Sequence, residues 1–526
     1  MQPLPKHTWI IRSADEDDVR RIAEALAIKL RAGDVVTLTG ELGAGKTTLA
    51  RAFIRAVLGE PDAEVPSPTF SLVQTYTHPR FAVAHADLYR VSDEAEVLEL
   101  GLDDAAAAGV ILVEWPERAP ALLKRENAIE IRIDECAAPE RRAITIEATG
   151  DAAKRLERAE AIWTFLSARR EWRPARVTYL QGDASVRAYA RLQGGPCPAI
   201  LMDWPEQPDG PPVRDGLSYS RIAHLAEGTR AFDAIASLLI DAGLRAPRIL
   251  DRDHAQGVLL IDDLGDRVFG SEVAEGAPLE PLWRAATLTL VELRHMTSDR
   301  IATWNARRDA IWRIPPMDLQ TLAIETELLI DWYWPLVWGM QIPDAVRAAF
   351  GEAWMPVFRR VTSELQGLAL RDYHSPNLLW LSDAPPATGS DVDRAVKSVG
   401  IIDFQDALIA HPAYDLVSLL QDARLDVPSD VETRLLDLYV RSVREREPAF
   451  DDAAFRAAYA ALGAQRNTKI LGIFARLNVR DGKPQYLRHI PRLWRYLERD
   501  LAHPGLEGVK AWFDENLPAR SRVLAS

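Results

Sequence analysis

The chain has 526 residues, too many for one hydrophobic core, so two or three domains are expected. Its apolar content is that of a globular protein, its net charge of −14 argues against a standing nucleic-acid surface, and no apolar run is long enough to span a bilayer. It contains two cysteines and its first residues carry no secretion signal, so we expect a cytoplasmic protein without a disulfide framework or a zinc site.

The first predicted elements are a helix, a strand and a second helix. Residues 15–30 place apolar side chains at helical spacing, and residues 35–39 (VVTLT) form a short apolar run typical of a buried strand. Residues 40–47 (GELGAGKT) match the phosphate-binding pattern G-x-x-x-x-G-K-[ST] at every required position. Residues 48–58 return to helical spacing. A strand, a glycine-rich loop and a helix are the context in which this pattern binds nucleotide phosphates.

The chemistry of this loop predicts a first site. Its glycines let backbone N–H groups turn towards phosphate oxygens, and the start of the helix adds positive potential. Lys46 reaches the β- and γ-phosphates, and the Thr47 hydroxyl can bind Mg²⁺. The predicted nucleotide-binding residues of the loop are Gly43, Ala44, Gly45, Lys46, Thr47 and Thr48.

Residues 65–70 (VPSPTF) hold two prolines, which rule out a helix interior and fix an extended loop. One interpretation is a stiff connector. The other is a switch loop that presents Ser67 or Thr69 to a γ-phosphate, and the residue pattern leaves both open.

Two predicted strands end in acids. Residues 81–90 alternate in polarity, and Asp87 near their end can either serve Mg²⁺, directly or through water, or meet solvent. Residues 109–114 (GVILVE) form a continuous apolar run that ends in Glu114. A buried parallel strand delivers a carboxylate beside a phosphate loop in this way. We therefore favour Glu114 as a catalytic acid, on the metal side or orienting water, over a surface glutamate.

These stretches, with residues 85–90 (HADLYR) and 114–116 (EWP), resemble the TsaE family of small ATPases needed for the threonylcarbamoyladenosine modification of tRNA. The resemblance covers residues 8–150 and implies an α/β P-loop NTPase domain. It implies that ATP and Mg²⁺ bind at Lys46, Thr47, Asp87 and Glu114, with Trp115 beside the nucleotide. It also implies action on a tRNA-modification protein complex, so no direct stable nucleic-acid binding is expected.

The rest of the chain has a different plan. Strands are predicted at residues 176–180, 187–192, 199–203, 248–250 and 257–261, with one helix at 218–242. A small sheet with one helix, followed by a large helical lobe, is the plan of an α+β bilobal, protein-kinase-like phosphotransferase domain. We predict a P-loop domain at 1–150, a helical linker at 151–171, an N-lobe at 172–265 and a C-lobe at 266–526.

Residues 370–377 (LRDYHSPN) place Asp372 five residues before Asn377, the spacing of a phosphotransferase catalytic loop. Asp372 would accept the proton of the attacking hydroxyl, and Asn377 would hold Mg²⁺. A later strand ends in Asp403, where such an enzyme needs its main Mg²⁺ ligand. We interpret Asp415 as a structural hydrogen bonder and not as a catalyst.

Residues 172–526 resemble the aminoglycoside-phosphotransferase-like kinases, and most of all those that phosphorylate N-acetylmuramate and N-acetylglucosamine at C1. The segments that carry the likeness are 182–185, 262–265, 372–377, 403–406 and 471–477. The resemblance implies nucleotide binding at Ser185 and Arg187. The third strand carries Met202 where these kinases usually have Lys, and Arg187 or Arg191 is a candidate replacement.

The sequence thus predicts a bifunctional fusion that uses ATP and Mg²⁺ twice: an ATPase for tRNA modification and a kinase that makes a sugar 1-phosphate from a small-molecule sugar. Two alternatives stay open. The kinase acceptor is an aminoglycoside, choline or another small alcohol, or the second half is a pseudokinase scaffold for the ATPase. Met202 favours the scaffold, whereas the intact Asp372, Asn377 and Asp403 oppose it.

Overall fold

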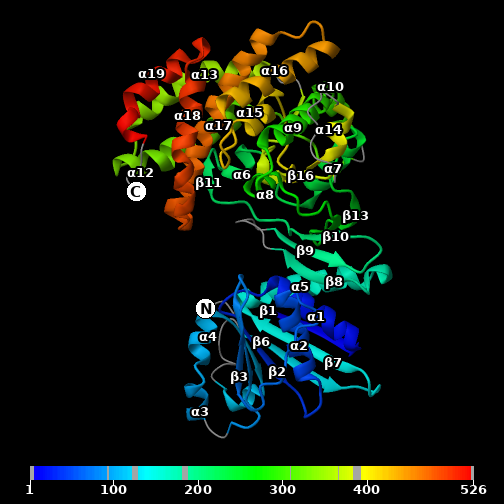
Figure 1. The fold of residues 1–526 in the computed structure, drawn as a ribbon. Coiled ribbons are helices and arrows are strands. Elements are labelled where there is room, and N and C mark those ends of the chain that lie inside the picture. The colour runs from blue at the N-terminus through cyan, green and yellow to red at the C-terminus, as the bar shows by residue number, and fades with distance from the viewer. Residues whose placement is uncertain are drawn as a thin grey trace. The chain divides into compact units, whose positions relative to one another are not determined.

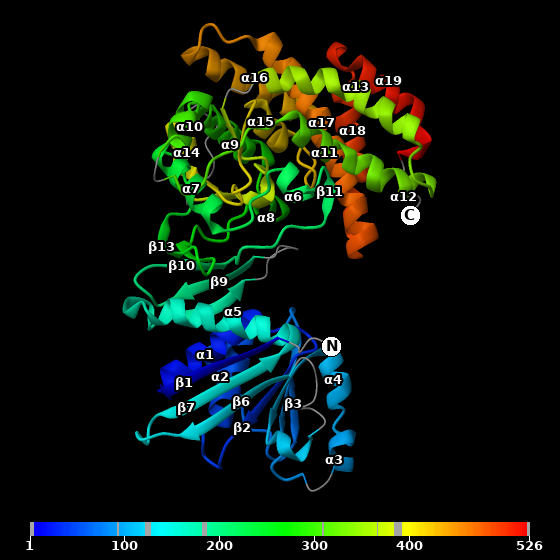
Figure 2. The same ribbon diagram turned by 180° about the vertical axis from the view of Figure 1, so that it is seen from behind.

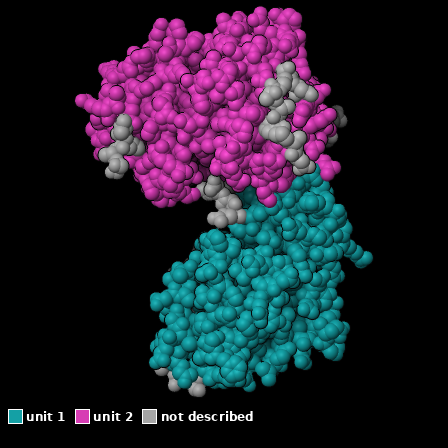
Figure 3. All heavy atoms as spheres, viewed as in Figure 1, with its two compact units in different colours: residues 1–205, 250–263 teal, residues 206–249, 264–526 magenta. Residues whose placement is uncertain are grey.

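The computed structural model describes residues 5–91, 94–120, 128–180, 187–307, 310–364, 367–382 and 392–522. The chain divides into two compact units, coloured separately in Figure 3. Unit 1 comprises residues 1–205 and 250–263, and unit 2 comprises residues 206–249 and 264–526. A helix with the length and apolar character to cross a membrane does not occur among the described residues.

Unit 1 contains a seven-stranded sheet of order β1-β7-β6-β2-β5-β4-β3, in which β6, β2, β5 and β4 run parallel. The strands are β1 (Lys6–Ala14), β2 (Val35–Thr39), β3 (Val73–Tyr76), β4 (Ala82–Asp87), β5 (Gly109–Glu114), β6 (Ala128–Glu135) and β7 (Arg142–Thr149). The helices are α1 (Glu16–Lys29), α2 (Lys46–Leu58), α3 (Glu94–Glu99), α4 (Leu102–Ala108) and α5 (Gly150–Ser167).

Helices cover both faces of this sheet, as the apolar run of β2 predicts for a parallel strand buried on both sides. Val36 and Leu38 of β2 join the hydrophobic cluster beneath α1, α2 and α5, whereas Val35 faces the cluster beneath α4. Asp15 caps α1 by accepting a hydrogen bond from the Asp18 backbone N–H. The loop between β2 and α2 thus begins at the end of a strand that is buried in the centre of the sheet.

A second sheet belongs to unit 1, with the order β13-β14-β10-β9-β8 and antiparallel pairing between β14, β10, β9 and β8. Its strands are β8 (Arg176–Leu180), β9 (Ala188–Gln193), β10 (Ala199–Asp203), β13 (Ile249–Asp253) and β14 (Val258–Asp262). Figures 1 and 2 show α1 and α5 between the two sheets. Leu192, Leu201 and Leu260 share one hydrophobic cluster with Ile22 of α1 and Ile162 of α5.

Unit 2 is mostly helical and carries short strand pairs. Its helices are α6 (Tyr219–Ile222), α7 (Thr229–Asp241), α8 (Phe269–Ala274), α9 (Leu279–Leu293), α10 (Ser298–Asn305), α11 (Leu319–Leu328), α12 (Trp334–Trp338), α13 (Asp344–Ser363), α14 (Val392–Ser398), α15 (Ala413–Leu420), α16 (Ser429–Arg446), α17 (Asp452–Asp481), α18 (Ile490–Leu501) and α19 (Glu507–Asn516). Its strands are β11 (Pro212–Arg214), β12 (Leu217–Ser218), β15 (Gly367–Ala369), β16 (Leu378–Trp380), β17 (Val399–Ile401) and β18 (Leu408–Ala410).

Helix α17 packs against α11, α15 and α18. A Cβ at Gly472 of α17 would lie 2.2 Å from the carbonyl carbon of Leu328, so only glycine allows this approach. The pairs β15–β18 and β16–β17 are antiparallel, and the loop between β15 and β16 carries residues 370–377.

Most predicted elements are confirmed, as is the fold class of a P-loop α/β domain followed by a kinase-like α+β domain. One prediction was wrong, the continuous helix at 218–242. The chain instead forms α6, leaves helical geometry, and starts again with α7. His224 takes a left-handed φ of 52°, and the backbone N–H of Ala226 donates to Asp406 at 2.7 Å, so a tertiary contact overrides the helical pattern.

Candidate active sites

The phosphate loop joins β2 to α2 and has the backbone that its glycines allow. Gly40, Gly43 and Gly45 have φ values of 147°, 83° and 107°, which side-chain-bearing residues rarely adopt. A Cβ at Gly40 would lie 2.4 Å from the carbonyl oxygen of Ile133 on β6. The glycines are therefore required by the turn and by this close approach.

Lys46 is the first residue of α2 and is buried, with 4% of its surface exposed. Its Nζ donates to the carbonyl oxygens of Gly40 at 2.7 Å and Glu41 at 2.9 Å and lies 3.6 Å from the centre of the Trp115 ring. Burial lowers the pKa of Lys46, and the nearby Glu114 carboxylate opposes that shift. Tyr89 packs against the same Trp115 ring at 5.0 Å.

Strand register brings the predicted acids together. Asp87 and Glu114 are direct partners at the carboxyl ends of β4 and β5, and Glu114 also pairs with Leu38 of β2. The Thr47 hydroxyl donates to Glu114 Oε2 at 2.9 Å, and His85 Nε2 lies 3.0 Å from Glu114 Oε1. Glu114 is buried, so these two contacts fix its carboxylate beside the phosphate loop.

The segment with two prolines contacts the other acid. Ser67 Oγ and Thr69 Oγ1 each lie 3.3 Å from Asp87 Oδ2 and 2.8 Å from each other, while the Tyr89 backbone N–H donates to Asp87 Oδ1 at 3.1 Å. Both hydroxyls thus face Asp87, the acid at the end of β4. Sequence reasoning had not assigned a role to His85, although its place two residues before Asp87 on the same face of β4 was visible.

This donor set fits Mg²⁺ and a nucleotide. Magnesium prefers oxygen ligands and is usually held by one or two carboxylates together with substrate phosphates. The hydroxyl of Thr47 and the carboxylates of Asp87 and Glu114 supply such oxygens, and the glycine-rich loop supplies backbone N–H groups at a helix start.

The second cluster of predicted site residues lies in unit 2. Asp415 of α15 accepts the backbone N–H of Leu370 at 2.7 Å and that of Arg371 at 3.0 Å, which confirms its structural role. Arg371 takes a left-handed φ of 71°, and Asp403 has a φ of 58°. Such conformations in side-chain-bearing residues persist where the surroundings impose them, and they cluster at functional sites.

The two loops are joined through Asn377. Its Nδ2 donates to the backbone oxygen of Asp372 at 3.0 Å and lies 3.5 Å from Asp403 Oδ2. Gln405 Nε2 donates to Asp403 Oδ1 at 3.2 Å, and the Ile402 backbone N–H donates to the Asn377 oxygen at 3.0 Å. The Asn377 side chain therefore lies beside both the Asp372 backbone and the Asp403 carboxylate, which brings the three predicted residues together.

Asp372 is half-buried at this site. Burial raises the pKa of its carboxyl, but His374, Lys469 and Arg466 more than offset this, so the pKa of Asp372 lies below its usual value. A carboxylate that is ionised at neutral pH can accept a proton from a hydroxyl.

A buried cluster of charged side chains surrounds Arg371, the residue before Asp372. Glu325 is fully buried and pairs with Arg371, with Lys469 Nζ at 2.6 Å and with Gln465 Nε2 at 2.9 Å. Burial raises the pKa of Glu325, but Lys469 and Arg371 lower it to about 2. Sequence reasoning missed Glu325 and Lys469, which lie 46 and 98 residues from Arg371 along the chain.

The remaining described residues of the predicted kinase site lie on or directly beside the five-stranded sheet of unit 1. Met202 is fully buried on β10 and pairs with Tyr189. The Arg187 guanidinium lies 5.2 Å from the centre of the Trp204 ring, and Arg191 Nε donates to Asp263 at 2.7 Å. Ser185 lies outside the described residues.

Two family models match the chain. The model of the threonylcarbamoyl adenosine biosynthesis protein TsaE matches residues 13–144, and that of the phosphotransferase enzyme family matches residues 176–456.

Curated relatives fall into the same two groups. An N-acetylmuramate/N-acetylglucosamine kinase of Caulobacter vibrioides is 37% identical over 70% of this chain and 98% of its own length. One from Pseudomonas aeruginosa is 31% identical over 62% of this chain and 85% of its own length. A tRNA threonylcarbamoyladenosine biosynthesis protein TsaE of Rickettsia bellii is 41% identical over 23% of this chain and 83% of its own length. The chain therefore belongs to the phosphotransferase enzyme family, in the group of the N-acetylmuramate/N-acetylglucosamine kinases, and carries a TsaE-family domain at its N-terminal side.

Proposed function

We propose that this chain has two ATP-dependent activities. Its TsaE-family domain hydrolyses ATP in service of the threonylcarbamoyladenosine modification of tRNA. Its kinase part transfers a phosphoryl group from ATP to the C1 hydroxyl of N-acetylmuramate or N-acetylglucosamine. The observation that carries the kinase proposal is the Asn377 amide, which links the catalytic loop at Asp372 to the predicted metal ligand Asp403.

In the kinase reaction the Asp372 carboxylate accepts the proton of the C1 hydroxyl, whose oxygen bonds to the γ-phosphorus. The bond from that phosphorus to the β–γ bridging oxygen breaks, and ADP leaves with the electron pair. Asn377 and Asp403 would hold Mg²⁺, which neutralises phosphate charge. The hydrogen bonds from Leu370 and Arg371 to Asp415 fix the backbone that carries Asp372.

In the ATPase reaction the N–H groups of residues 43–48 and the Nζ of Lys46 bind phosphate oxygens, while Thr47, Asp87 and Glu114 would hold Mg²⁺ directly or through water. Glu114 orients the attacking water, and Thr69 faces the γ-phosphate from the loop that already contacts Asp87. The Trp115 ring, stacked over Lys46, lies beside the nucleotide.

The predicted domain boundaries, 1–150, 151–171, 172–265 and 266–526, are part of this proposal, as is a cytoplasmic location. The partner of the ATPase domain is the protein complex that modifies tRNA. Ser185 and Arg187 bind the kinase nucleotide, and Arg187 or Arg191 supplies the charge that a lysine would carry at the position of Met202.

The test uses the full chain with N-acetylmuramate, N-acetylglucosamine, kanamycin and choline as acceptors of phosphate from labelled ATP. Asp372→Asn should reduce sugar phosphorylation by about 10²–10⁴-fold and leave acceptor-independent ATP hydrolysis unchanged. Lys46→Ala should do the converse. Asp393→Asn and Lys154→Ala change exposed residues of the same types and should alter neither activity.

Transfer to kanamycin or choline alone would overturn the sugar acceptor. A lack of transfer to every acceptor by the folded chain would favour the scaffold alternative. If Asp372→Asn leaves sugar phosphorylation intact, Asp372 is not the base.

A further inference from the structure

A cavity of about 460 Å³ lies in unit 1 between α1, α2 and β8. Helix α2 is the helix that follows the phosphate loop, whereas β8 is the first strand of the kinase-like sheet. The TsaE-family part and the kinase-like part of unit 1 therefore both line this cavity. Its volume is within the range of small-molecule sites in proteins.

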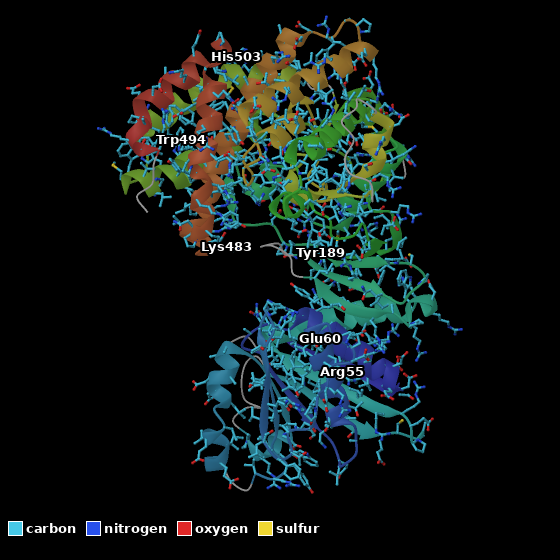
Figure 4. The ribbon with its side chains drawn as sticks, viewed as in Figure 1. Arg55, Glu60, Tyr189, Lys483, Trp494 and His503 are labelled. Atoms are coloured by element: carbon cyan, nitrogen blue, oxygen red, sulfur yellow. The ribbon has the colours of Figure 1, made fainter. Side chains whose placement is uncertain are left out.

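Arginine side chains line this cavity from two sides. Arg51 Nε donates to the carbonyl oxygen of Val65 at 3.1 Å, and Arg55 Nε donates to that of Ala63 at 2.9 Å. The Nη groups of both have no hydrogen-bond partner among the described residues, nor does the guanidinium of the exposed Arg176. Figure 4 labels Arg55 on α2.

The charges around the cavity leave an excess of guanidinium donors. Four arginines and three acids line it, namely Arg20, Arg51, Arg55, Arg176, Glu16, Asp17 and Glu24. Arg20 is occupied, because it bonds to Asp17 at 3.1 Å and to Glu24 at 2.7 Å. The lining thus carries one net positive charge, and Arg20 is the one arginine of the four with an ion pair to these acids in the described part of the chain. Guanidinium groups bind phosphate through paired, charge-assisted hydrogen bonds.

A buried acceptor is present in the same cavity. Glu24 is 6% exposed and its Oε1 accepts the hydrogen bond from Arg20, whereas its Oε2 makes no hydrogen bond in the described part of the chain. Burial raises the pKa of Glu24, and Arg20, Arg176 and the Val177 backbone N–H oppose that shift. A ligand hydroxyl would satisfy the Oε2 atom. The walls therefore combine donors for a phosphate with an acceptor for a hydroxyl.

We propose that this cavity binds a small phosphorylated sugar, with its phosphate on Arg51, Arg55 and Arg176 and a hydroxyl on Glu24. The choice of a sugar phosphate rests on the proposed kinase function, because that reaction makes a compound of this class. Arg51 and Arg55 are held in place by the backbone of residues 63–65, which leads into the segment of Ser67 and Thr69 beside Asp87. The ligand would thus contact side chains that hold the backbone leading to the ATPase site.

The test is hydrogen exchange of the full chain with N-acetylglucosamine 1-phosphate, read by mass spectrometry. The sugar phosphate should protect residues 48–61 and 173–180 in the presence of saturating MgADP, and N-acetylglucosamine should not. Arg176→Glu should weaken this protection at least about tenfold, which corresponds to about 1.4 kcal/mol, and Arg176→Lys should weaken it less. Arg12→Glu, at an exposed arginine of β1, controls for the change in net charge.

Every other outcome overturns either the inference or the proposed function on which it rests. Equal protection by inorganic phosphate would mean a general anion site. Loss of the protection when ADP is added would make the cavity part of the nucleotide site. A chain that phosphorylates the sugar but shows no protection of these residues overturns the cavity proposal alone, whereas protection without sugar phosphorylation would count against the proposed kinase function.

Discussion

Asp203 holds the ATPase-side helices against the kinase-like sheet within unit 1. It is the last residue of β10 and is fully buried. Its carboxylate pairs with Lys29 at the end of α1 and with Arg158 of α5. Arg158 also donates to the carbonyl oxygen of Gln256 at 2.7 Å. We predict that Asp203→Ala destabilises unit 1 more than the loss of any exposed ion pair.

The magnitude follows from burial. Lys29 and Arg158 keep 13% and 18% of their side-chain surface exposed, so removal of Asp203 leaves two mostly buried basic side chains without the carboxylate that pairs with both. Breaking a buried pair in this way costs about 3–5 kcal/mol, because the remaining charge is desolvated and unpaired. Asp203→Asn keeps the volume and some hydrogen bonding, so its cost should be smaller.

The assay is native-state hydrogen exchange of the full chain in denaturant, because it gives the free energy of opening for each segment separately. Peptides from α1, α5 and β10 should lose about 3–5 kcal/mol in Asp203→Ala. The control is Asp134→Ala, which removes the partner of Arg132 in an exposed pair and should cost below about 1 kcal/mol. A cost for Asp203→Ala as small as that of the control would refute the buried-cluster reasoning.

Three further predictions concern unit 2 and the fusion. Acidification from pH 6.5 to 4 should destabilise unit 2, because burial lowers the pKa of His374 and of His411 to about 4. The unfolded chain therefore binds more protons than the folded chain in this pH range, so stability rises with pH. The number of protons taken up on unfolding, obtained from the pH dependence of the urea unfolding free energy, should fall by about one in His411→Asn. Glu325→Gln should lower both kcat and stability, the latter by about 3–5 kcal/mol, since Arg371 and Lys469 lose their counter-charge; unchanged kcat and urea midpoint would contradict this. A fragment of residues 172–526 should aggregate on expression, whereas the full chain should not, because the fragment exposes the sheet face covered by α1 and α5; a monomeric fragment in size-exclusion chromatography would contradict this.

The local features of both sites could be predicted from the sequence. The strand, glycine-rich loop and helix around Lys46 lie within about two dozen consecutive residues, so residue spacing and polarity suffice to predict them. The spacing from Asp372 to Asn377 is likewise local. The residues Asn377 and Asp403 stand next to two predicted strands, the first after Asn377 and the second before Asp403. Antiparallel pairing of these strands brings the two residues together, so their approach could also be predicted.

The contacts that fix these residues could not be predicted in the same way. Glu325 reaches Arg371 and Lys469 from α11, a largely apolar helix that carries two acids, Glu325 and Glu327. Pairing between residues so far apart in the sequence leaves no periodic signal. The break between α6 and α7 depends on a backbone N–H captured by Asp406, 180 residues away. The helical spacing of apolar residues in 218–242 carries no information about this distant hydrogen bond.

The hydrophobic cluster that α1 and α5 share with the five-stranded sheet explains why the TsaE-family domain and this kinase-like sheet form one structural unit. An antiparallel sheet commonly packs one face against a hydrophobic core and leaves the other face in water. Here Leu192, Leu201 and Leu260 place apolar side chains on the face that α1 and α5 cover, and the acid at the end of β10 meets cations from the same helices. The ATPase-side helices thus act as the second layer of the kinase-like sheet. A change that loosens α1 or α5 therefore reaches β10, the strand of Met202.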